Sequence, residues 1–133
     1  MNHIELNELD IASPTVVRAA ARDFAAALAD TPQFKAFESA YAELNKDTAA
    51  RQALSAYQEK SKSLRAVLML NAVSETDRAE LERLKAEYVT RPTVQAYAAA
   101  EAELTALCQQ TAGMISQAIG LNYAASCGAS CCG

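Results

Sequence analysis

Several residue types that support common protein functions are scarce or missing in this sequence. The 133 residues include no tryptophan, only 6% aromatic residues and a single histidine, His3. Without a histidine elsewhere, a Cys–His or Ser–His catalytic couple has no base, and a Glu-x-x-His di-iron site on a helix is excluded. Glycine-rich phosphate loops, H-E-x-x-H and nucleophile-elbow motifs are also absent. The sequence therefore predicts a protein that is not an enzyme.

Positive charge and long apolar runs are lacking as well. Twelve basic against sixteen acidic residues give a net charge of -4, which argues against unaided nucleic-acid binding, because phosphate contacts need a local excess of Lys and Arg. The densest basic stretch, with Lys60, Lys62 and Arg65, is interpreted as a solvated helix face. No segment offers the roughly 18 apolar residues that span a membrane, and the N-terminus lacks the order of a secretory signal. We expect a cytoplasmic protein.

What the sequence does contain is a nearly continuous helical pattern. No glycine occurs before Gly113, and each of the three prolines lies at a position where a helix can begin. Ser–Pro and Thr–Pro pairs combine a capping residue with a first-turn proline, and S-E-T-D is a capping box. The pattern predicts helices that start at Pro14, at Pro32, near Asp47, after Ser74 and at Pro92, the third running to about Val73 and the last to Gly120.

The apolar residues of these helices form narrow stripes at steps of three and four. The two longest helices, about 47–73 and 92–120, would each extend roughly 40 Å. Because such helices cannot enclose a spherical core in a short chain, each stripe needs a facing helix. We predict an all-α fold, an elongated antiparallel hairpin or bundle of about four to five helices, as a domain over 1–121. Uncovered apolar surface would then bind another chain in a homo- or hetero-oligomer.

Two helices of the pattern resemble each other. P-Q-F-K-A-F-E-S-A-Y-A-E-L starts at Pro32, and P-T-V-Q-A-Y-A-A-A-E-A-E-L starts at Pro92. Capped amphipathic helices rich in Ala, Glu and Leu can converge on such similarity. Alternatively, the two helices present similar faces and pack as pseudo-symmetric partners.

The flexible tail, residues 122–133, gathers three of the four cysteines, Cys127, Cys131 and Cys132, as C-x-x-x-C-C. In a reducing compartment, clustered thiols indicate metal or redox chemistry more than a disulfide framework. Zn²⁺ and iron–sulfur clusters prefer thiolates and normally take four protein ligands. Cys108 lies on the apolar face of the last helix and is better interpreted as a buried small hydrophobe. The fourth ligand is therefore expected from another chain or a second copy.

Three segments together resemble a known family of bacterial regulators. They are SPTVVRAAARDFAAALADTPQFKAFESAYAELNKD, with its T-P-Q-F helix start and N-K-D break, RPTVQAYAAAEAEL, and the closing IGLNYAASCGASCCG. They look similar to the YlbF/YmcA family, in its YlbF-like branch, over roughly residues 12–133. The cysteine tail is the most specific part of the resemblance.

The resemblance implies an all-helical accessory subunit without catalytic activity. It further implies YmcA-like and YaaT-like partners in a cytoplasmic complex that carries iron–sulfur clusters, here [4Fe-4S] shared with a partner chain or a Zn²⁺ site. That complex would support endoribonuclease-dependent mRNA processing and affect competence, sporulation and biofilm formation. Among the residues of this chain, only Cys127, Cys131 and Cys132 match the cysteine tail that supplies ligands in the family. Two alternatives stay open: a metal-handling or thiol-redox protein that uses the same tail, and a helical structural module with an inert tail.

Overall fold

The computed structural model describes residues 13–126 of the chain. Within this range it contains seven helices and no strand, which confirms the all-α fold. The helices are α1 (Pro14–Ala29), α2 (Pro32–Lys46), α3 (Thr48–Ser63), α4 (Arg65–Met69), α5 (Glu75–Val89), α6 (Pro92–Ile119) and α7 (Tyr123–Ser126). Five of them are long, as expected, while α4 and α7 are single turns of five and four residues.

The predicted capping residues begin the helices as expected. The hydroxyls of Ser13, Thr31 and Ser74 each accept a hydrogen bond from the backbone N–H three residues later, at 3.4, 3.2 and 3.1 Å. These bonds satisfy N–H groups that have no partner inside the first helical turn. Local sequence signals therefore place the starts of α1, α2 and α5.

The single helix predicted over 47–73 is wrong, because α3 ends at Ser63. The Ser63 hydroxyl donates a hydrogen bond to the Lys60 carbonyl at 2.8 Å, one of the bonds by which serine competes with helix continuation. Leu64 leaves the helical conformation and is only 8% exposed. Asn71 then adopts a positive φ of 51°. The reversal lets α5 return along α3, which a straight helix would prevent.

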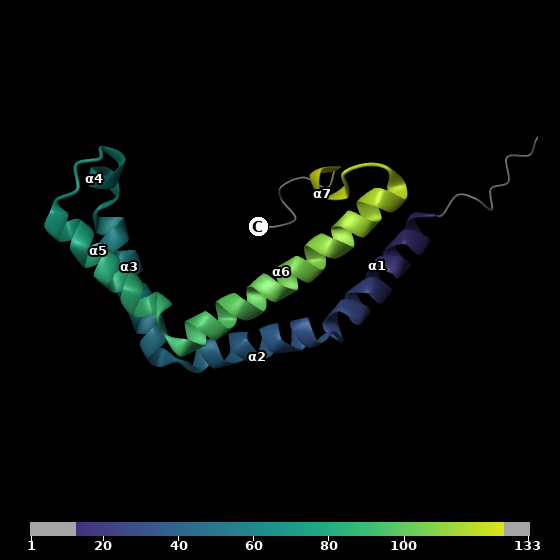
Figure 1. Cartoon of the computed structure of the whole chain (residues 1–133), viewed down its shortest axis with the longest axis horizontal. Helices are drawn as coiled ribbons and strands as arrows, with labels where there is room; N and C mark the ends of the chain where they lie inside the picture. The colour runs from purple at the N-terminus through teal and green to yellow at the C-terminus, as the bar shows by residue number, and fades with distance from the viewer. Residues whose placement is uncertain (1–12, 127–133) are drawn as a thin grey trace, which may run out of the picture.

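The helices form two antiparallel pairs that meet at an angle. α2 packs along the first half of α6, and α3 packs along α5 (Figure 1). α1 and the second half of α6 extend away from the α3–α5 pair, toward the opposite end of the molecule (Figure 1). The elongated antiparallel arrangement is confirmed, and the bend between the pairs is a feature that the hydrophobic pattern did not predict.

The two similar helices of the sequence are the partners in the α2–α6 pair. Phe37 and Tyr97 are each the fifth residue after the first proline of their helix, and their ring centroids lie 5.5 Å apart. Equivalent residues meet in this way when two similar helices cross antiparallel about a two-fold axis. Burial raises the pKa of the Tyr97 phenol. Of the two interpretations that the similarity left open, the structure favours the one in which these helices pack against each other.

One carboxylate, that of Asp47, joins the two helix pairs at the bend. Its Oδ1 caps α3 by accepting the Ala50 N–H at 2.9 Å. Its Oδ2 accepts the Thr93 hydroxyl of α6 at 2.7 Å, and the Arg91 guanidinium lies 3.3 Å from Oδ1. The Thr93 and Ala50 hydrogen bonds, followed by Arg91, lower the pKa of Asp47 from 3.8 to about 2.

The interior that these contacts enclose is small. Among the described residues, four apolar side chains are buried: Ala50, Ala53, Leu64 and Val94. Large apolar side chains stay exposed on the helices that have no facing partner, as the narrow stripes predicted. The helix pairs, rather than a central core, hold the fold together.

Asp47→Asn tests the contribution of the carboxylate at the bend. Because the folded-state pKa lies below the unfolded value, this contribution is complete above about pH 4 and is lost as the pH falls toward 2. We expect the thermal midpoint of the variant at pH 7 to fall by roughly 3–6 °C. Between pH 5 and 2, its midpoint should then fall less than that of the wild type. Asp23→Asn is the control, since Asp23 forms no ion pair within residues 13–126. If the thermal midpoints of both variants changed equally with pH, the role assigned to Asp47 would be contradicted.

Candidate functional site

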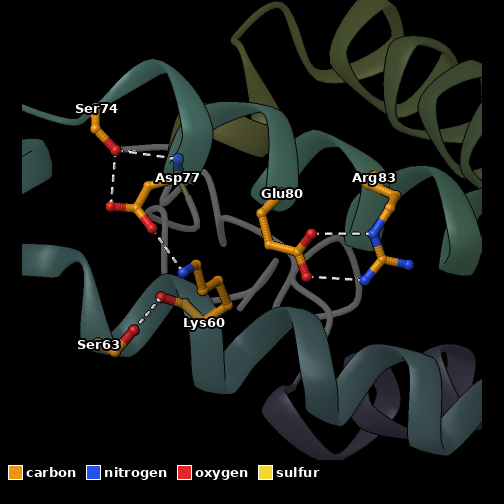
Figure 2. Close-up of polar contacts among 6 residues, drawn as sticks. All are labelled: Lys60, Ser63, Ser74, Asp77, Glu80 and Arg83. Carbon is orange, nitrogen blue, oxygen red and sulfur yellow. Dashed lines mark hydrogen bonds and ion pairs between the residues drawn. The ribbon is translucent and has the colours of Figure 1, made fainter.

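The polar residues between α3 and α5 form a structural cluster (Figure 2). Lys60 Nζ lies 2.7 Å from Asp77 Oδ1, and the Ser74 hydroxyl donates to Asp77 Oδ2 at 3.0 Å. The Lys60 bond, followed by the Ser74 bond, lowers the pKa of Asp77. One turn later, Glu80 and Arg83 form a bidentate pair at 3.0 and 2.8 Å. Lys60, expected on a solvated basic face, instead ties α3 to α5, so this cluster contributes to packing.

The second half of α6 carries a different surface. No Asp, Glu, Lys, Arg or His occurs after Glu103 in the sequence, although most side chains of this segment are exposed. Met114, for example, is 70% exposed. Charged residues are depleted at the centres of protein interfaces. The search for regularly spaced apolar residues did not reveal this surface. The absence of charged residues over the last thirty positions of the sequence indicates it.

The chain reverses at the end of α6. Gly120 takes a left-handed conformation with φ 73°, which glycine adopts without strain. The Tyr123 N–H then donates to the Ser116 hydroxyl at 3.1 Å, so α7 lies against the end of α6. The Ala125 N–H donates to Asn122 Oδ1 at 3.2 Å and closes the single turn. The start of α7 is therefore held against α6.

Four exposed apolar side chains lie within ten residues of one another in the sequence, from the last turns of α6 to the first residue of α7, and we refer to them as the terminal patch. They are Met114, Ile119, Leu121 and Tyr123. Large exposed apolar groups close together are typical of a binding surface in a protein. The terminal patch ends at Tyr123, four residues before Cys127 in the sequence.

Cys108 is exposed, and its expected burial is wrong. Helical spacing placed Cys108 on an apolar face of α6, but α2 covers only the first half of α6 (Figure 1). Cys127, Cys131 and Cys132 lie outside the described residues. Within residues 13–126, no three His, Cys, Asp or Glu side chains come close enough to hold a metal ion. Ligation by the three tail cysteines stays a prediction.

A membrane-spanning helix is also not found in the part of the chain that the structure describes. Within the same residues, the polar groups at the bend and between α3 and α5 are engaged in helix capping and packing. The remaining distinctive features are exposed helical faces. The described residues define an all-helical protein in which several large apolar side chains are exposed.

A comparison with protein families identifies this class more closely. The family model described as "Control of competence regulator ComK, YlbF/YmcA" matches residues 17–120. The chain belongs to this family, which is a family of regulators. The match ends at Gly120, before the cysteine tail. The chain matches no curated protein and no solved structure.

Two glycine substitutions test how the end of α6 positions the tail. A Cβ added at Gly120 or at Gly113 meets no atom within 4 Å. Gly120→Ala should therefore act through its positive φ alone, which costs roughly 1–2 kcal/mol. We expect hydrogen exchange over residues 121–126 to accelerate about 5- to 30-fold. Gly113→Ala, within the helix, should slow exchange in the second half of α6, because alanine favours a helix by about 0.5–1 kcal/mol. The same effect from both variants would contradict the role of Gly120.

Proposed function

We propose that this protein is a non-enzymatic regulatory subunit of a cytoplasmic bacterial complex. Family membership supports the regulatory role. The observation that carries the proposal further is the uncharged, exposed end of α6 with its terminal patch. In this proposal the patch docks YmcA-like and YaaT-like partners, and the adjacent tail contributes thiolates to an iron–sulfur cluster shared with a partner.

The docking role follows from the surface chemistry of the terminal patch. Leu121 and Tyr123 remain 49% and 41% exposed although α7 folds back onto α6. Burying these side chains and Ile119 against a partner removes apolar area from water. No charged residue of the same segment has to be desolvated, because the sequence contains none after Glu103. The burial of apolar area and the absence of charges that would have to be desolvated both favour association through the terminal patch.

The donor set of the tail suits a cluster. Cys127, Cys131 and Cys132 supply three soft thiolates, and a cubane [4Fe-4S] cluster takes four protein ligands. A partner that docks on the terminal patch would bring the fourth. When bound, such a cluster supplies a redox-sensitive, iron-dependent tie between the chains. In this proposal, the chain holds the shared cluster beside the terminal patch.

The proposed complex supports endoribonuclease-dependent mRNA processing and thereby affects competence, sporulation and biofilm formation. This chain would act by assembling the complex and would reach the endoribonuclease only indirectly. A net charge of -4 and an uncharged docking surface are consistent with a protein partner in preference to RNA. Regulation would then lie in whether the complex is assembled.

Cysteine substitutions test the cluster. Protein purified anaerobically with its partners from the native host should contain iron and sulfide and absorb broadly in the visible. Combined Ser substitution of Cys127, Cys131 and Cys132 should remove most of the iron, because a cluster that lacks three thiolates is not retained. Cys108→Ser is the matched control and should keep the iron content of the wild type.

Other outcomes distinguish the remaining functions of the tail. If the purified protein contained stoichiometric zinc and no iron, the tail would form a Zn²⁺ site and not an iron–sulfur cluster. Rapid metal exchange with a chelator, independent of partners, would identify a metal carrier. Wild-type activity in cells after all three Ser substitutions would show an inert tail. Each of these results would contradict the shared cluster.

A charge placed in the terminal patch tests docking separately. Ile119 is 53% exposed, so Ile119→Glu should leave the helical content and thermal midpoint nearly unchanged. Burying the new carboxylate at an interface is unfavourable, and we expect at least a 10-fold loss of co-purifying partners. Gln109→Glu introduces the same charge at another exposed position of α6 and should retain them. Equal partner recovery from both variants would exclude the terminal patch.

A further inference from the structure

The reversal between α3 and α5 carries the most exposed large apolar side chains of the described residues. Met69 and Leu70, at the end of α4, are 82% and 79% exposed, and Leu68 beside them is 41% exposed. We refer to these three residues as the α4 tip. Figure 1 shows α4 at the far end of the α3–α5 pair, away from α7. The α4 tip is therefore a surface separate from the terminal patch.

Backbone hydrogen bonds close the turn that carries these side chains. The Asn71 N–H donates to the Leu68 carbonyl at 3.1 Å, and the Ala72 N–H donates to the Val67 carbonyl at 3.0 Å. With Asn71 at a positive φ of 51°, this is the bond pattern of a Schellman motif at a helix end. Leu64, only 8% exposed, anchors the start of α4 in the interior. The apolar side chains of the tip are thus presented on a hydrogen-bonded turn.

Positive charge lies next to the α4 tip. Residues 60–74 contain three cations, Lys60, Lys62 and Arg65, and no acid, although the whole chain carries a net charge of -4. Lys60 is engaged by Asp77 at 2.7 Å. Lys62 and Arg65 are exposed and form no ion pair within residues 13–126. An anionic surface that meets the tip therefore finds two cations whose charge is not neutralised by an ion pair there.

The shape and chemistry of the tip fit a lipid surface. Met69 and Leu70 project from one end of an elongated molecule (Figure 1), so a flat surface can reach them without meeting the other helices. A protein partner would need a pocket that matches this protrusion, whereas acyl chains adapt to it. Apolar side chains at the acyl boundary, with Lys and Arg at the headgroups, are the pattern of segments that lie on anionic membranes.

We infer that the α4 tip inserts into the surface of a bilayer that contains anionic phospholipids. Met69 and Leu70 enter the acyl boundary, and Lys62 and Arg65 lie at the headgroups. A helix of five residues is far shorter than a membrane span, so the contact involves one leaflet. Even a single myristoyl chain gives only reversible membrane binding, and this tip should also bind reversibly. The inference goes beyond the proposed function and does not rest on it.

Co-sedimentation of the full chain with vesicles, under reducing conditions, tests the apolar part of the contact. The vesicles are either equimolar phosphatidylglycerol and phosphatidylcholine or phosphatidylcholine alone. The wild type should bind the anionic vesicles and bind the neutral ones more weakly. Met69→Ser and Leu70→Ser should each weaken binding about 10-fold, because each removes one inserted side chain. Val16→Ser is the matched control, since Val16 is an exposed apolar residue of α1, and it should change binding less than about 3-fold.

Removal of charge tests the second part of the contact. Combined Lys62→Gln and Arg65→Gln should weaken binding to the anionic vesicles roughly 10- to 30-fold, because each cation gains energy near an anionic surface. The remaining binding should depend less on salt than that of the wild type. Combined Arg22→Gln and Lys85→Gln removes the same net charge from residues that form no ion pair within residues 13–126. This control should keep the affinity and salt dependence of the wild type.

A fluorescent reporter distinguishes insertion from adsorption. The chain contains no tryptophan, so Leu70→Trp supplies a single indole at the tip. Its emission should shift to shorter wavelength when anionic vesicles are added, and brominated acyl chains should quench it. Val16→Trp places the indole on α1 and should show neither effect. Circular dichroism of every variant checks that the helices still form.

Several results would overturn the inference. They are a wild type that binds neither kind of vesicle, equal losses in the tip variants and their matched controls, and an unshifted Leu70→Trp emission in protein that sediments with vesicles. If the tip variants lost co-purifying proteins while the wild type bound no vesicles, the tip would belong to a protein partner, and the inference would be wrong. Loss of iron or of partners from tail or terminal-patch variants leaves vesicle binding unchanged, so the two proposals fail independently.

Discussion

The carboxylate of Asp47 is the interaction on which the arrangement of the helices depends. It satisfies the N-terminus of α3 and, at the same time, two side chains that begin α6. α2 and α3 thereby meet α5 and α6 at one place, and the two antiparallel pairs acquire a defined bend. All the surfaces described above take their positions from that junction. The aromatic contact between Phe37 and Tyr97 then sets how α2 and α6 face each other.

The same geometry explains why residues 13–126 enclose little interior. Two helix pairs that diverge from a bend bury few side chains, and α6 continues well past the N-terminal end of α2 (Figure 1). The extra length of α6 has no counterpart in its own chain at Cys108 or at Met114. Its lack of charge makes that length unsuitable as an ordinary solvated helix and suitable as a contact for another molecule. In the function proposed above, partner choice would then depend on the end of α6.

Local signals in the sequence predicted the features that depend on a few neighbouring residues. Capping serines and threonines followed by proline or an acid predicted the helix starts, and the repeated P-x-[FV]-x-A motif indicated the α2–α6 pairing as one of two interpretations. The Asp47 junction was not predictable in this way, because Arg91 and Thr93 are 44 and 46 residues distant in the chain. The end of α3 was missed since the apolar pattern continues through Leu64. Cys108 was misjudged because periodicity shows which face is apolar, whereas burial requires a second helix to be there. The ligand role of Cys127, Cys131 and Cys132 depends on residues outside the described range and stays a prediction.

The small number of buried side chains also has a consequence for the thermodynamics of this chain. Heat capacity and denaturant sensitivity both scale with the apolar surface that unfolding exposes. Because only four apolar residues among the 114 described positions are fully buried, this chain exposes less such surface on unfolding than a globular domain of the same length. Its stability curve is therefore shallow, and its melting is gradual compared with a globular domain of the same length. Association with another molecule adds the missing apolar burial, so the steepness of the transition reports how much of the chain is bound.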